Sequence, residues 1–103
     1  MPTAIAKQPE INAAVRAAER LPGVKYIRYS IAPDSNGRWA IFFRVVLADE
    51  VSTGERLRDV TTQVIWRMSE GLDLPNLDLI PYFDFRSQSE QNALNEPHWQ
   101  QAS

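Results

Sequence analysis

With 103 residues, of which 44% are hydrophobic and 23% charged, the chain has the size and composition of one globular domain. It contains no cysteine, which excludes disulfides, thiolate metal sites and cysteine nucleophiles and fits a reducing compartment. The net charge is -2, so no overall field draws the protein to nucleic acid or anionic lipid. Without a long apolar run or a secretory signal at the N-terminus, we expect a cytoplasmic protein with no membrane partner.

The first half of the chain predicts a helix followed by two strands. Apolar residues recur at helical spacing between Pro9 and Arg20, namely Ile11, Ala14, Val15 and Ala18. Pro22-Gly23 ends this helix. Alternation of apolar and polar residues over 27–31 predicts a strand, and 39–47 predicts another. Between them, the Pro-Asp-Ser-Asn-Gly run at 33–37 favours a chain reversal, so the two strands form an antiparallel hairpin.

The second half predicts a long helix, a third strand and a short capped helix. From Thr53 the period becomes helical, with one wide stripe made of Leu57, Val60, Thr61, Val64, Ile65, Met68 and Leu72. A loop at 73–78 ends this helix, and 79–86 predicts a strand in which Pro81 favours an edge position or the first residues. Ser87 to Glu90 has the capping-box pattern, which predicts a short helix to about Asn95.

The order α-β-β-α-β predicts an α+β fold with a three-stranded sheet, two helices on one of its faces and a short C-terminal helix or tail. We divide the chain into a flexible N-terminus (1–8), an α+β domain (9–86) and a C-terminal segment (87–103). Leu94 and Trp99 are the large apolar groups that would hold this last segment against the domain or a neighbouring subunit. A frayed tail is the alternative.

Strand alternation predicts an unusual second face of the sheet. If Trp39, Ile41, Phe43, Val45 and Leu47 point to the helices, the opposite face carries Tyr26, Arg28, Ser30, Ala40, Phe42, Arg44, Val46, Ile80, Tyr82, Asp84 and Arg86. Aromatic rings and guanidinium groups are the ingredients of a platform for single-stranded nucleic acid. Because sheets seldom leave so much apolar area in water, we favour cover by another subunit or by the chain's own tail.

Trp66 lies nearly opposite the apolar stripe of the long helix, among polar residues. A tryptophan on a polar helix face is a common anchor of protein interfaces. If the helix is instead buried on two sides, Trp66 belongs to the core.

Groups that could carry catalysis are few. The single histidine, His98, lies near the C-terminus, so a catalytic triad or a multi-histidine metal site has little to be built from. Asp84 and Glu90 could be proposed as an acid–base pair, but an ion pair of Asp84 with an arginine and a helix cap at Glu90 are favoured. Glycine-rich phosphate loops are absent. We therefore predict no enzyme activity, no catalytic residue, no cofactor and no metal.

Two resemblances follow from these residues. The element order over residues 10–86 resembles the type II KH arrangement of ribosome-binding factor A, without the Gly-x-x-Gly loop of KH domains, since the glycines are Gly23, Gly37, Gly54 and Gly71. That resemblance implies an architecture and no binding residue. The segments AIFFRVVL (40–47) and PYFDFRSQSE (81–90) are similar to those of a group of small uncharacterised bacterial proteins, which implies no activity.

Our hypothesis from the sequence is a non-enzymatic protein that acts by association, as a homodimer or as the small subunit of a complex. The alternative is a single-stranded RNA or ribosome-associated module that uses the same sheet face. The residues predicted to bind a partner are Tyr26, Arg28, Phe42, Arg44, Trp66, Tyr82 and Arg86.

Overall fold

A computed structural model describes residues 7–72, 78–93 and 100–101. The elements are α2 (Gln8–Glu19), β1 (Val24–Pro33), β2 (Trp39–Leu47), the short 3-10 helix η1 (Asp49–Val51), α3 (Gly54–Gly71), β3 (Ile80–Ser87), α4 (Gln88–Asn92) and β4 (Gln100–Gln101). The α+β class and the order of the long elements are confirmed.

The strand order in the sheet is β3-β2-β1-β4. β1 and β2 form the predicted antiparallel hairpin, and β3 runs parallel to β2. Parallel neighbours need a crossover, which α3 supplies. Pro81 therefore lies in an edge strand, as predicted. The two residues of β4, which the sequence did not indicate, pair antiparallel with β1 at its other edge.

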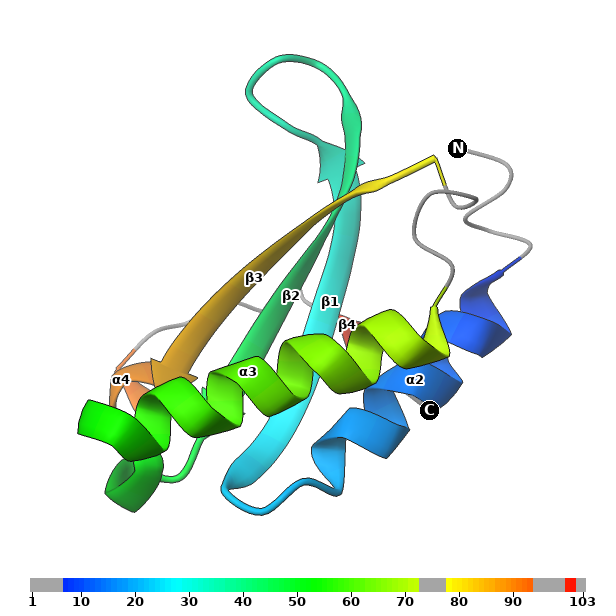
Figure 1. Ribbon diagram of the computed structural model, residues 1–103. Coiled ribbons are helices and arrows are strands. Elements are labelled where there is room, and N and C mark those ends of the chain that lie inside the picture. Colours follow the sequence, from blue (N-terminus) through cyan, green and yellow to red (C-terminus); the bar gives the residue numbers. More distant parts are fainter. Residues whose placement is uncertain (1–6, 73–77, 94–99, 102–103) are drawn as a thin grey trace.

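Both long helices cover one face of the sheet (Figure 1). The predicted stripe of α2 is buried, and α3 contributes Val60, Val64 and Met68. These side chains pack on buried sheet residues, of which the largest are Ile27, Tyr29, Ile41, Phe43, Val45 and Leu47.

Three side chains depart from the predicted core. Ile65 is 41% exposed. The buried residues of α3 recur every four positions, at Val60, Val64 and Met68, so the stripe that meets the sheet is narrower than the predicted one and leaves Ile65 outside it. Leu57, one turn earlier, is only partly buried against the core. Trp39 shares the sheet face of Ile41 and Phe43, as predicted, but is 42% exposed. The end of the hairpin projects beyond the two helices, so they do not cover it there (Figure 1).

A buried tyrosine ties α2 to the sheet. The Tyr29 hydroxyl donates a hydrogen bond to Asn12 Oδ1 (2.8 Å) and accepts one from Gln8 Nε2 (3.2 Å). Tyr29 is almost fully buried, so these two contacts satisfy a hydroxyl that would otherwise be costly to desolvate.

The capping box at Ser87 is confirmed, and the helix that it begins ends at Asn92. Leu94, His98 and Trp99 lie outside the described residues, as do residues 1–6 of the predicted flexible N-terminus. Within the described ranges, no helix has the length and apolar character to cross a membrane.

Candidate functional site

The sheet face that points away from α2 and α3, here called the outer sheet face, is ordered in rows across three strands. Residues directly opposite one another in neighbouring strands share a face of the sheet. The rows are Tyr26, Val46 and Arg86; Arg28, Arg44 and Asp84; Ser30, Phe42 and Tyr82; and Ala32, Ala40 and Ile80. Six of the seven predicted partner-binding residues are therefore brought together here.

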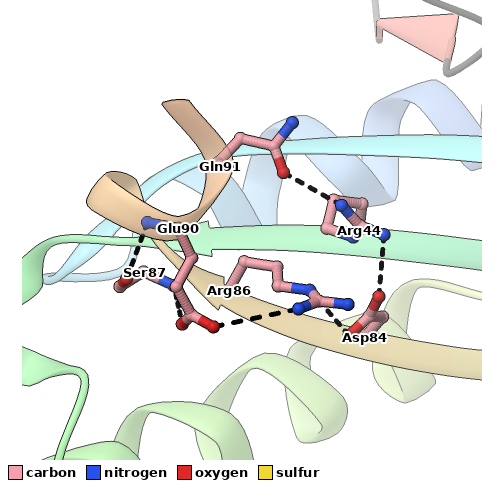
Figure 2. A network of polar contacts seen from close by, with 6 residues as sticks. All are labelled: Arg44, Asp84, Arg86, Ser87, Glu90 and Gln91. Carbon is pink, nitrogen blue, oxygen red and sulfur yellow. Dashed lines mark hydrogen bonds and ion pairs between the residues drawn. The ribbon is translucent and has the colours of Figure 1, made fainter. Parts of the chain in front are cut away.

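Arg44 is at the centre of this face and only 6% exposed. Its Nη2 lies 2.8 Å from Asp84 Oδ2, and its Nη1 donates a hydrogen bond of 2.9 Å to Gln91 Oε1 of α4 (Figure 2). A buried guanidinium needs such partners, because desolvating a cation is expensive. Arg44 therefore joins β2, β3 and α4, and little of its side chain remains at the surface.

Arg86 belongs to the same network. Its Nε lies 3.5 Å from Asp84 Oδ1 and its Nη1 lies 3.8 Å from Glu90 Oε2 (Figure 2). Glu90 also accepts the backbone N–H of Ser87, and this hydrogen bond is the main reason that the pKa of Glu90 is lowered. Asp84 and Glu90 thus form the ion pairs and the helix cap that the sequence favoured over an acid–base pair.

The aromatic row of the outer sheet face is partly open to solvent. The rings of Phe42 and Tyr82 stack with centroids 5.2 Å apart, and Tyr82 is 40% exposed. The Tyr82 hydroxyl donates to Asp34 Oδ2 in the hairpin loop, which raises the pKa of Tyr82. The pKa of Asp34 is lowered, mainly because its carboxylate accepts the backbone N–H of Arg38. These contacts hold the loop against β3.

Arg28 differs from the other two arginines of this face. Its guanidinium lies 4.5 Å from the centroid of the Tyr26 ring, a cation–π geometry. Across the strand it faces Arg44, and the nearest carboxylate in the row, Asp84, is paired with Arg44. The positive charge of the outer sheet face is therefore smaller than its three arginines suggest.

Both edges of the sheet are partly closed. Backbone N–H groups point alternately to the two sides of a strand. The N–H of Asp34 donates to Arg38 O across the hairpin, so the N–H groups of the even-numbered residues of β1 point toward β2. The N–H groups of its odd-numbered residues therefore point away from β2, to the outer edge of the sheet. There, Ile27 N–H donates to Glu19 Oε2 (2.7 Å), Tyr29 pairs with β4 and Pro33 has no N–H.

The β3 edge is closed in the same manner. The backbone N–H of Ser87 donates to Glu90 and not to β2, so the N–H groups of the odd-numbered residues of β3 point away from the sheet. One of these residues is Pro81, which has no N–H. Among the described residues, this leaves only Phe83 and Phe85 as outward donors of β3. A short edge strand that contains a proline disfavours strand addition by another chain.

Trp66 lies apart from this network, on the outer surface of α3. It is 66% exposed, so the alternative that places it in the core is wrong. Beside it is a shallow open hollow of about 330 Å³, lined by Leu21, Gln63, Trp66, Arg67 and Glu70. The seven predicted residues therefore form two separate surfaces, the outer sheet face and the outer face of α3.

No pattern in the sequence indicated the contact that fixes α4 beside η1. Ser89 Oγ donates to Asp49 Oδ2 (2.5 Å) and its N–H donates to Asp49 Oδ1 (3.0 Å). The Ser89 hydroxyl is the main cause of the lowered pKa of Asp49. Forty residues separate the two partners, and no local pattern connects them.

Within residues 7–72, 78–93 and 100–101, no group of three or more histidine, aspartate or glutamate side chains is placed to hold a metal ion. Comparisons with protein-family models, with curated proteins and with solved structures find no match for this chain.

Proposed function

We propose that this is a non-enzymatic cytoplasmic protein that acts by binding another protein through the outer face of α3, with Trp66 as the anchor. The observation that carries the proposal is the exposure of Trp66 beside the hollow lined by Leu21 and Gln63. A large aromatic ring next to a concavity and surrounded by polar side chains is typical of an interface hot spot.

The free energy available from this residue is substantial. A tryptophan buries about 150–250 Å² when fully covered. Two-thirds of that area, at roughly 25 cal/mol per Å², corresponds to an upper bound of about 3 kcal/mol, from which the entropy cost of association is subtracted. Ile65, the next exposed apolar residue of α3, would add to this contact.

Other surfaces offer less to a protein partner. The two sheet edges are interrupted by prolines and by the carboxylates of Glu19 and Glu90. On the outer sheet face, Ala40 and Val46 are already fully buried and Arg44 is engaged by α4. The outer face of α3 therefore has the largest exposed apolar group that the described chain leaves unmatched.

A single-stranded RNA module that uses the outer sheet face is the second candidate. The stacked Phe42 and Tyr82 rings favour it, since bases stack on such rings. The engagement of Arg44 and Arg86 by carboxylates opposes it, because phosphate binding needs available cations. Binding to an unstructured oligonucleotide at two salt concentrations separates the candidates, since a steep salt dependence is expected only for RNA binding.

The test of the proposed function compares two tryptophans. Trp66→Ala should lower the mass of the native complex captured from the cells that produce the protein. Trp39→Ala is the matched control, because Trp39 is also exposed but is the first residue of β2 and lies outside α3. Circular dichroism should show that both variants are folded. A native complex that persists in the Trp66→Ala variant would refute the proposal.

A further inference from the structure

Two opposite charges lie beside Trp66 in the wall of the hollow. Arg67 and Glu70 are one turn apart on α3, and both are exposed. In the described part of the chain neither forms an ion pair, unlike the equally spaced Lys7, the N-cap residue of α2, and Glu10, which lie 3.3 Å apart. The charges at this surface are therefore available to a partner.

A surface that meets its own copy must be self-complementary. In a two-fold contact residue i meets residue j and residue j meets residue i, so a patch with one sign of charge repels itself. A patch with a basic and an acidic residue beside a central apolar group satisfies this condition, because each arginine can meet a glutamate.

We propose that the partner bound by the outer face of α3 is a second copy of this chain, an inference that rests on the proposed function. The two α3 helices cross antiparallel about a two-fold axis at the hollow. Arg67 then lies beside Glu70 of the partner subunit, and this contact occurs twice. Trp66 packs into the concavity bounded by the partner's Leu21.

The size of this contact sets the strength of the dimer. The two-fold axis lies between Arg67 and Glu70, and α3 ends at Gly71, so the two helices overlap only over residues 66–71 of each, about 9 Å of helix. This contact is far smaller than the ≈ 800 Å² per partner of a standard interface. The dimer should therefore be weak and reversible. Sedimentation between about 1 and 500 micromolar should show the average mass rising with concentration.

Charge reversal tests the pairing directly. Arg67→Glu and Glu70→Arg should each weaken the dimer by roughly ten-fold or more, because two attractive contacts become repulsive. The double variant R67E/E70R should recover most of the affinity, since the pairing is restored with its polarity exchanged. A mixture of the two single variants should form a heterodimer more strongly than either variant self-associates. Arg56→Glu, about 16 Å from Arg67 along the same helix, is the control for the change in net charge.

Three results would overturn the inference. The wild-type protein could stay monomeric throughout this concentration range, or the single charge variants could dimerise like the wild type. The third is a mixture of the two single variants whose average mass is no higher than that of either variant alone. If the protein is monomeric but its native complex depends on Trp66, self-association fails and the proposed function stands. If the native complex is indifferent to Trp66, both fail.

Discussion

Replacing Asp84 with alanine removes the main partner of a buried cation. Arg44 Nη2 loses a carboxylate oxygen at 2.8 Å and retains the neutral amide of Gln91. Breaking a fully buried ion pair costs about 3–5 kcal/mol. The Asp84 side chain is 45% exposed, so water can reach part of the space that it leaves, and we expect roughly half of that cost, about 2 kcal/mol.

Urea and thermal denaturation followed by circular dichroism measure this loss. For a domain of this size a change of about 2 kcal/mol lowers the melting temperature by roughly 8–16 °C. Adding Arg44→Met to Asp84→Ala removes the buried cation as well, and should recover at least half of the lost stability. Glu10→Ala, which breaks the exposed ion pair with Lys7, is the control and should change the free energy of unfolding by no more than about 0.5 kcal/mol.

An Asp84→Ala protein that unfolds at the wild-type midpoint would refute this reasoning, since it would mean that Arg44 is not desolvated in the folded state. A double variant no more stable than Asp84→Ala alone would locate the cost in lost packing rather than in the buried charge of Arg44.

Three further predictions concern the core, the C-terminal helix and the sheet edge. Val64→Ala should cost about 2–4 kcal/mol and Ile65→Ala less than about 0.5 kcal/mol, and equal unfolding midpoints would contradict the orientation of α3. The lowered pKa of Asp49 contributes stability that is present above the unfolded value of 3.8 and is lost as the pH falls through the folded value. Ser89→Ala should therefore make stability less sensitive to acid below about pH 4, and an unchanged pH profile would argue against the contact. Glu19→Ala should cost about 1 kcal/mol and increase light scattering on heating, whereas Glu19→Gln, which keeps an acceptor oxygen, should behave nearly like the wild type.

The strands and their faces could be predicted because their signals are local. Alternation fixes which side chains share a face, and the loop residues at 33–37 fix the hairpin, so the predicted strand at 39–47 has the bounds of β2. The register then places Arg28, Arg44 and Asp84 in one row without further information. The capping box at Ser87 is equally local, and it is present.

Other features depend on contacts between distant segments. Helical periodicity grouped Ile65 with Val64, but the sheet accepts only the narrower stripe. The pairing of β4 with β1 and the contact of Asp49 with Ser89 join residues that are far apart in the sequence. Local patterns carry no signal for either.

The position of the interface follows from which groups remain unmatched after folding. The sequence displays three arginines on one sheet face, and their number suggests a binding surface for an anion. In the fold, Asp84 and Glu90 engage two of them, and the third stacks on a tyrosine ring. A charge that already has a partner inside the molecule contributes little to binding a second one, because the first contact must be given up. Among the described residues, Trp66 and the charges beside it have no such internal partners, and for this reason the outer face of α3 is the surface on which association should depend.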